Sequence, residues 1–218
     1  GFYGLMGAGR TELMRAIFGA DKFDSGQILV NNSQVEIKNC RTATKLGIAL
    51  LTEDRKNQGL ILSFPIKENI SLANLDKLMN KFGIRHSFET RNAEKMAEMV
   101  NVKTPSINQL VVNLSGGNQQ KVVIAKWLNT NANILIFDEP TRGIDIGAKV
   151  EIYKIMNDLK KQGKAIIMVS SELTECMGVS DRLYVMHEGV ITACIEKLEG
   201  LTEDDIIKYA TGSVRNIN

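Results

Sequence analysis

A serine followed by two glycines marks a stretch of this sequence suited to holding an anion. Residues 114–121 read Leu-Ser-Gly-Gly-Asn-Gln-Gln-Lys, and an apolar run that predicts a helix follows at 122–128. Ser115, Gly116 and Gly117 would leave backbone N–H groups bare at the N-terminus of that helix, where the helix dipole favours negative charge. The stretch therefore indicates a phosphate-binding site.

A second stretch has the residue types and the spacing of a phosphate-binding loop. Residues 4–11 read Gly-Leu-Met-Gly-Ala-Gly-Arg-Thr, which is the P-loop spacing with Arg10 where lysine belongs. Apolar residues at helical spacing from 13 to 18 predict that the loop opens a helix, as phosphate binding requires. The alternative is a glycine-rich turn before a helix. The candidate phosphate-binding residues here are Gly4, Gly7, Ala8, Gly9, Arg10, Thr11 and Glu12.

A pair of acidic residues completes the chemistry. Residues 134–137 are continuously apolar and predict a fully buried strand, which places Asp138 and Glu139 at its carboxyl end.

The order and spacing of these stretches resemble the ATP-binding cassette (ABC) ATPases over almost the whole chain, from residue 4 to about 212. Residues 114–121 resemble the signature, and 134–139 resemble the Walker B strand. The residues at 114–121, together with Glu-Asp-Arg-Lys at 53–56, resemble those of a narrower group within this family. That group is the second cassette of the double-cassette ATPases that drive monosaccharide importers of the ribose, galactose, xylose and arabinose type.

The resemblance implies an α/β fold of the P-loop NTPase class, RecA-like, with a mostly parallel sheet flanked by helices, a small antiparallel β layer and an inserted helical lobe. Residues 1–218 would form a single ABC domain, with a core at 1–59 and 113–218 and the lobe at 60–112. Because little chain precedes the glycine loop, we interpret the sequence as a fragment with a truncated first strand.

The resemblance also implies ATP and Mg²⁺ as cofactors. The P-loop residues, the signature residues Ser115, Gly116 and Gly117, and Asp145 of the D-loop would contact the nucleotide. The candidate metal ligands are Thr11, Asp138 and Glu53. Glu139 would orient or deprotonate the attacking water. Ser171 stands where hydrolysing cassettes carry a switch histidine, and it is the second candidate catalytic residue beside Glu139.

Four departures from the family pattern gather on the face that would hold this domain's own nucleotide. They are Arg10, Glu12, Glu53 and Ser171. A guanidinium is larger than an ammonium and prefers bidentate partners, and a carboxylate at 12 repels a nearby phosphate. The signature, which the family offers to a partner cassette, matches in full. We therefore expect an asymmetric pair in which this domain completes the partner's site and holds its own nucleotide weakly.

Composition limits the classes of partner. A net charge of +2 gives no polyanion-binding surface, so nucleic acid is not expected. No apolar run approaches the ~20 residues that cross a bilayer, so no direct membrane insertion is expected. Cys40, Cys176 and Cys194 are widely spaced and indicate ordinary thiols of a reducing compartment.

The resemblance implies partners that the sequence itself does not contain. They are an N-terminal cassette in the same polypeptide, membrane permease subunits and an extracytoplasmic sugar-binding protein. The cassette would be peripheral at the cytoplasmic face of the membrane. Two alternatives stay open: a non-hydrolysing regulatory nucleotide-binding domain, and a soluble ABC ATPase of DNA repair or translation. Against the latter, the sequence has no long heptad segment, zinc-binding cysteine set or basic stripe.

Patterning elsewhere predicts the elements that must position these residues. Hairpins are predicted at 27–37 and 186–191, helices at 66–79 and 93–102, and a last helix that starts between Thr202 and Asp205 and ends at Gly212. Val150, Tyr153, Ile155, Met156 and Leu159 predict one face of an amphipathic helix. The apolar loop at 60–65 is either local core or a permease-docking surface.

Overall fold

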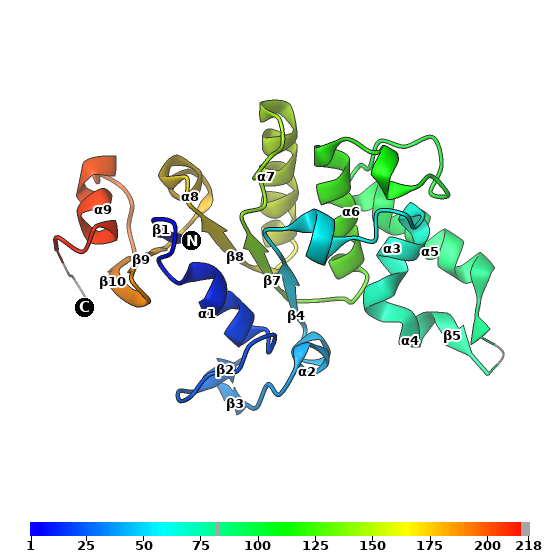
Figure 1. Cartoon of the computed structure of the whole chain (residues 1–218), viewed down its shortest axis with the longest axis horizontal. Helices are drawn as coiled ribbons and strands as arrows, with labels where there is room; N and C mark the ends of the chain where they lie inside the picture. Colours follow the sequence, from blue (N-terminus) through cyan, green and yellow to red (C-terminus); the bar gives the residue numbers. More distant parts are fainter. Residues whose placement is uncertain (82, 215–218) are drawn as a thin grey trace. The chain divides into compact units, whose positions relative to one another are not determined.

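The computed structural model describes residues 1–81 and 83–214 (Figure 1). They divide into two compact units that the chain enters more than once. The first unit contains Gly1–Leu50, Ile134–Pro140 and the described residues from 165 onward. The second contains Leu51–Asn133 and Thr141–Lys164. Residues 51–59 and 113–133 share a unit with the predicted lobe, whose boundaries at 60 and 112 stay a prediction.

A six-stranded sheet with the order β10-β9-β1-β8-β7-β4 forms the centre of the first unit. The strands are β1 (Phe2–Gly4), β4 (Ile48–Leu51, its last residue assigned to the second unit), β7 (Ile134–Asp138), β8 (Ala165–Ser170), β9 (Leu183–His187) and β10 (Val190–Ile195). β1 runs parallel to β8 and β9, β7 runs parallel to β8, and β10 is antiparallel to β9. The predicted mostly parallel sheet is confirmed.

The register of this sheet brings three segments with predicted site residues to one edge. Tyr3 lies beside Ser170, and Asp138 lies beside Val169, across parallel pairs. Because parallel strands end at the same edge, the P-loop after β1, Glu139 after β7 and Ser171 after β8 all leave the sheet there.

Short helices and hairpins complete the first unit. The helices are α1 (Arg10–Ile17), α2 (Cys40–Lys45), α8 (Leu173–Val179) and α9 (Glu203–Ala210), and β2 (Ile28–Val30) pairs with β3 (Ser33–Val35). The predicted capping box is present between Thr202 and Asp205, and Gly212 with φ 73° follows the last helix. Glu188 and Gly189, with φ 46° and 78°, make the predicted turn of the β9–β10 hairpin.

The second unit is mainly helical. Its longer helices are α5 (His86–Met99), α6 (Gly116–Leu128) and α7 (Ile146–Lys161), and α3 (Ile66–Ser71) packs against α5 and α6. The shorter elements are η1 (Arg55–Gly59), η2 (Leu72–Asn74), α4 (Leu75–Leu78), η3 (Val111–Asn113) and the hairpin of β5 (Met79–Asn80) and β6 (Gly83–Ile84). No helix in the described part of the chain is long and apolar enough to span a membrane.

Two helix predictions need correction. The helix predicted at 66–79 is broken into α3, η2 and α4. Ser71 and Leu72 keep helical backbone angles, and the chain leaves the helical region at Asn74, with φ −145° and ψ 38°, where the Asn74 side chain donates to the Asn129 carbonyl. In α7 the buried stripe is Ile152, Met156 and Leu159, at i, i+4 and i+7, whereas Val150 lies off that stripe and is 61% exposed.

Candidate functional site

The P-loop follows β1 and turns through two left-handed glycines. Gly7 has φ 80° and Gly9 has φ 90°, conformations that favour glycine. A Cβ at Gly4 would lie 2.5 Å from the Met186 carbonyl oxygen, and a Cβ at Gly9 would lie 3.0 Å from the Gly189 Cα, so the loop packs closely on the β9–β10 hairpin. A Cβ at Gly7 would meet nothing within 4 Å, so this glycine borders open space.

The loop delivers the N-terminus of α1 without a side-chain cap. Gly9 is the N-cap residue and makes no capping hydrogen bond, so the first N–H groups of the helix suit an anion. Glu12 lies in the first turn of α1 and is exposed. The helix dipole stabilises this negative charge, but the charge would repel a phosphate bound at the same end of the helix.

Asp138, at the end of β7, is a buried acid with an unused oxygen. Its Oδ1 is buried and has no hydrogen-bond partner among the described residues, and the Thr11 hydroxyl hydrogen-bonds to the same carboxylate. Burial raises the pKa of Asp138 to about 6, with Thr11 opposing the shift. A carboxylate and a hydroxyl beside a phosphate loop fit Mg²⁺, which takes one or two protein ligands and fills its shell with phosphate and water.

Arg10 and Glu139 form a shielded ion pair. Arg10 Nη1 lies 3.1 Å from Glu139 Oε1, and the two side chains are 10% and 9% exposed. The same Oε1 accepts a hydrogen bond from the Ser171 backbone N–H at 2.8 Å. Glu139 has φ 47°, a strained conformation for a residue other than glycine. The predicted base is therefore held by the residue that replaces the P-loop lysine.

Two serines follow one another at the end of β8 and behave differently. Ser170 is fully buried, and its hydroxyl donates to Glu175 Oε2 at 3.0 Å and accepts from the Glu172 N–H. Ser171 is exposed, and its backbone rather than its hydroxyl contacts Glu139. A catalytic role for the Ser171 side chain stays a prediction.

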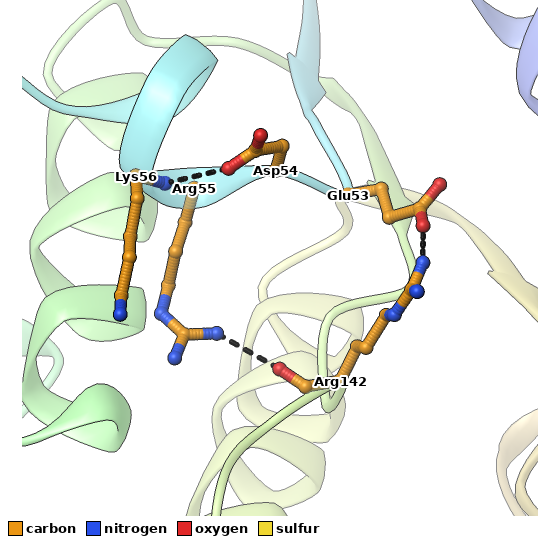
Figure 2. A pocket seen from close by; sticks show the side chains of 5 residues that line it. All are labelled: Glu53, Asp54, Arg55, Lys56 and Arg142. Carbon is orange, nitrogen blue, oxygen red and sulfur yellow. Dashed lines mark hydrogen bonds and ion pairs between the residues drawn. The ribbon is translucent and has the colours of Figure 1, made fainter.

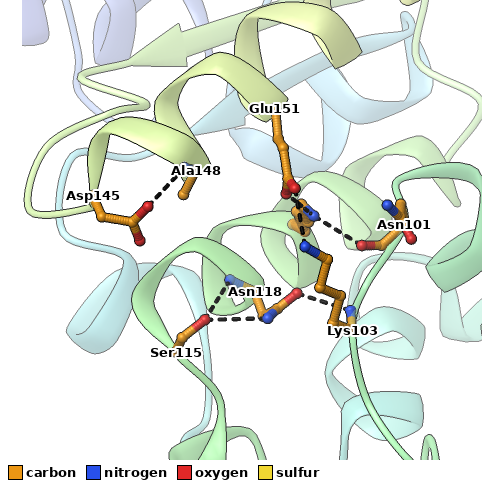
Figure 3. A network of polar contacts seen from close by, with 8 residues as sticks. Asn101, Lys103, Ser115, Asn118, Asp145, Ala148 and Glu151 are labelled. Atoms are coloured by element: carbon orange, nitrogen blue, oxygen red, sulfur yellow. Dashed lines mark hydrogen bonds and ion pairs between the residues drawn. The ribbon is translucent and has the colours of Figure 1, made fainter.

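The signature, in the second unit, begins α6 with Ser115 as its N-cap (Figure 3). The exposed Ser115 hydroxyl accepts from the Asn118 backbone N–H at 3.4 Å and from Asn118 Nδ2 at 3.1 Å. Asn118 Oδ1 in turn accepts from the Lys103 N–H at 2.8 Å. With its oxygen occupied by these donors, Ser115 keeps its own hydroxyl proton for an outside acceptor.

The signature glycines have no room for side chains. A Cβ at Gly117 would lie 2.6 Å from the Ala148 Cβ of α7, and a Cβ at Gly116 would lie 2.8 Å from Arg55 Nη2. Asp145 begins α7 as its N-cap and accepts from the Ala148 N–H at 2.9 Å (Figure 3). Asp145 therefore caps a helix, and nucleotide contact by it stays a prediction.

A network of charged side chains joins α6 to α7 beside the signature glycines (Figure 3). The Lys121 ammonium is 2% exposed, contacts Glu151, and donates to the Asn101 carbonyl at 2.8 Å. Lys103 Nζ approaches the same Glu151 at 3.1 Å. Two hydrogen bonds lower the pKa of Glu151, and the one from Lys121 has a larger effect than the one from Lys103.

Figure 2 shows the segment after β4 beside the turn that precedes α7. Glu53 pairs with Arg142, so its carboxylate is neutralised by a cation. Arg55 donates from Nη1 to the Arg142 carbonyl at 2.8 Å and from Nη2 to the Gly143 carbonyl at 3.2 Å. A pocket of about 300 Å³ is lined by Glu53, Asp54, Arg55, Lys56 and Arg142. Metal binding by Glu53 stays a prediction.

The described residues contain no cluster of three or more His, Cys, Asp or Glu side chains that could hold a metal by itself. Any Mg²⁺ at Thr11 and Asp138 would therefore depend on phosphate and water for the rest of its shell.

Comparison with known proteins decides the family. The family model described as ABC transporter matches residues 1–142. The chain belongs to this family. Among curated relatives of this ABC chain, a ribose import ATP-binding protein of Oceanobacillus iheyensis is 52% identical over 97% of the chain. A putative ribose/galactose/methyl galactoside import ATP-binding protein of Agrobacterium fabrum is 48% identical, also over 97%. The chain spans 42% of each of these two relatives.

Solved structures support the same fold. A nucleotide-free ATP-binding cassette from an ABC transporter aligns with a TM-score of 0.79 at 22% identity, covering 95% of this chain and 85% of that one. The predicted P-loop NTPase fold of the ABC type is confirmed.

The two units of this ABC chain gather the predicted residues in two groups. The first unit brings together Arg10, Thr11, Asp138, Glu139 and Ser171, and the second contains the signature, Glu53 and Asp145. No role was predicted from the sequence for Arg55, Asn118 or Glu151. Their types were visible, but contacts such as those of Arg55 with residues 142 and 143 depend on tertiary folding.

Proposed function

We propose that this chain is one of two cassettes of an ATPase that couples ATP binding and hydrolysis to uptake of a monosaccharide through an ABC importer. The P-loop, the Asp138 and Thr11 pair and the exposed Ser115 of the signature support nucleotide handling. The names of the relatives support sugar import, with ribose as the first substrate to test. A bound nucleotide would supply the phosphoryl group whose transfer drives the import.

The proposal includes an asymmetry between the two cassettes, and the Arg10–Glu139 ion pair is the observation that carries it. A phosphate at the P-loop would compete with Glu139 for the Arg10 guanidinium, and an Arg10 drawn to the phosphate would leave Glu139 with a weaker counter-ion. A Glu139 carboxylate held by Arg10 is also less free to orient or deprotonate water. Phosphoryl transfer depends on positioning and charge stabilisation, so this competition favours slow turnover at the chain's own P-loop.

In the proposal, the signature serves the nucleotide of a companion cassette and not the nucleotide at this chain's own P-loop. Exposed Ser115 and the N–H groups of Gly116 and Gly117, which the Ser115 cap on Asn118 does not use, would complete the nucleotide site of a companion cassette. The other proposed partners are membrane permease subunits and an extracytoplasmic sugar-binding protein, with this chain peripheral at the cytoplasmic face. The sugar would be selected by those partners.

Uptake of radiolabelled ribose tests the proposal. Cells lacking the protein should lose uptake and regain it with the wild-type protein, whereas Ser115→Ala at equal abundance should restore less than about a tenth, because a donor to the phosphates is lost. Unlabelled galactose, xylose and arabinose as competitors would identify the sugar class. Unchanged uptake of all four sugars in the deletion would contradict sugar import.

The ion pair also favours a second candidate, a non-hydrolysing regulatory domain whose nucleotide serves only to hold the cassettes together. The two candidates differ in turnover. Nucleotide-binding and turnover assays on this chain alone and on the intact double cassette separate them: turnover of the nucleotide bound at this chain's own P-loop, even slow, supports the import ATPase, and binding there without turnover supports the regulatory domain.

A further inference from the structure

Arg55 lies at the junction of three segments of the second unit (Figure 2). Its own segment follows β4, its guanidinium reaches the carbonyls of residues 142 and 143, and its Nη2 fills the space over Gly116. The same Nη2 thus donates to the Gly143 carbonyl at 3.2 Å and would lie 2.8 Å from a Cβ at Gly116. One side chain therefore contacts both the signature and the turn that leads into α7.

The backbone around Arg55 is fixed independently of these contacts. Asp54 caps the turn at 55–59 by accepting from the N–H groups of Lys56 at 3.2 Å and Asn57 at 3.1 Å. Its Oδ2 also accepts from Asn57 Nδ2 at 2.7 Å. The capped turn directs the Arg55 side chain, whose rigid fork matches two adjacent carbonyls.

We propose that Arg55 is a positioning residue that holds the 142–145 turn against the signature and thereby sets where Ser115 and Gly116 lie. The inference rests on the proposed role of the signature in completing a companion's nucleotide site. The hydrogen bonds of Arg55 in this arrangement go to backbone carbonyls. Its loss would empty the space over Gly116 and release the two carbonyls, so the signature could shift.

The chemistry of the fork makes the proposal specific. A lysine carries its three donors on a single nitrogen, so it could not present the two parallel N–H directions with which the Arg55 fork meets the carbonyls of residues 142 and 143. Lys56 is the matched control, since it is adjacent, carries the same charge and has an exposed side chain. A shift of about 1 Å in a positioning group can cost up to about 10²-fold in rate.

The test is the steady-state ATPase activity of the complete importer with Arg55→Ala, Arg55→Lys, Lys56→Ala, Ser115→Ala and the Arg55→Ala/Ser115→Ala double variant. We expect Arg55→Ala to lower kcat about tenfold with KM for MgATP nearly unchanged, because the companion's P-loop still binds the nucleotide. Arg55→Lys should lose roughly threefold, and Lys56→Ala less than twofold. The double variant should match Ser115→Ala alone, since both changes act through the signature.

The outcomes separate this inference from the proposed function. An unaffected Arg55→Ala beside a strongly impaired Ser115→Ala overturns the inference alone, and so does a double variant whose losses multiply. An unaffected Ser115→Ala instead overturns the proposed function. If Arg55→Ala does not fold, Arg55→Lys carries the test, and wild-type activity in that variant contradicts the need for the fork.

Discussion

At the scale of single residues, the charge at position 10 has two competing uses. Arg10 contacts Glu139 in the first unit, with both side chains largely shielded from water. Removing one partner of a buried pair is costly because the other charge stays behind. A nucleotide phosphate must therefore compete with Glu139 for Arg10, which a compact lysine ammonium would do with less rearrangement.

Arg10→Lys should tighten binding of MgATP to the purified chain by roughly tenfold, since one charge-assisted hydrogen bond contributes about 1.5–3 kcal/mol. Isothermal titration calorimetry measures the affinity. Arg15→Lys is the matched control, because Arg15 lies on the same helix but pairs with exposed Asp21. Equal or weaker binding by Arg10→Lys would show that the arginine does not limit affinity.

Burial of Lys126 makes the free energy of unfolding depend on pH, and the direction of the lowered pKa gives the sign of that dependence. Its ammonium donates to the Gly59 carbonyl at 2.5 Å, and burial lowers its pKa from 10.5 to about 8. Between these two pKa values the unfolded state binds more protons than the folded state, so stability rises with pH. The cost of charging Lys126 is full below pH 8 and disappears above pH 10.5.

The free energy of unfolding of the wild type should therefore rise by about 1 kcal/mol relative to Lys126→Met between pH 7 and pH 9. Urea titrations at the two pH values measure it. An equal change in the free energy of unfolding of the two proteins between pH 7 and pH 9 would mean that Lys126 titrates as an exposed lysine does.

At the scale of elements, the approach of α6 to α7 shapes the second unit. Gly117 leaves no space for a methyl group beside Ala148, and Lys121 and Glu151 join the same two helices by an ion pair. Ser115 and Asp145 begin these helices as N-caps. The spacing of the two helices therefore determines the separation of two predicted nucleotide contacts.

Gly117→Ala should lower the free energy of unfolding by about 1–3 kcal/mol, because its Cβ would overlap that of Ala148 and force the helices apart. Gly178→Ala on α8 is the control. A Cβ there meets nothing within 4 Å, so helix propensity predicts a neutral or slightly stabilising change. Chemical denaturation of both variants checks the difference, and equal stabilities would contradict the packing argument.

At the scale of the whole molecule, local patterning predicted the hairpins and the ends of α9, whereas the mostly parallel sheet followed from the family resemblance. Thr11, Asp138 and Glu53 were predicted as metal ligands from their motifs, and the structure brings Thr11 and Asp138 together while Glu53 pairs with Arg142. The Arg10–Glu139 pair was not predictable from these signals, because it depends on the strand register that brings the two loops to one edge. The break of the predicted helix at Asn74 was missed because the apolar pattern continues through it.

The comparison of Ser115→Ala with Arg10→Ala in the assembled importer tests the central claim most directly. The claim is that this chain completes a companion's nucleotide site while its own P-loop contributes little turnover. We predict that Ser115→Ala lowers sugar-stimulated ATP hydrolysis roughly a hundredfold, as loss of a transition-state donor does, and that Arg10→Ala stays within about twofold of the wild type. Intact hydrolysis in Ser115→Ala, or abolished hydrolysis in Arg10→Ala, would contradict the account.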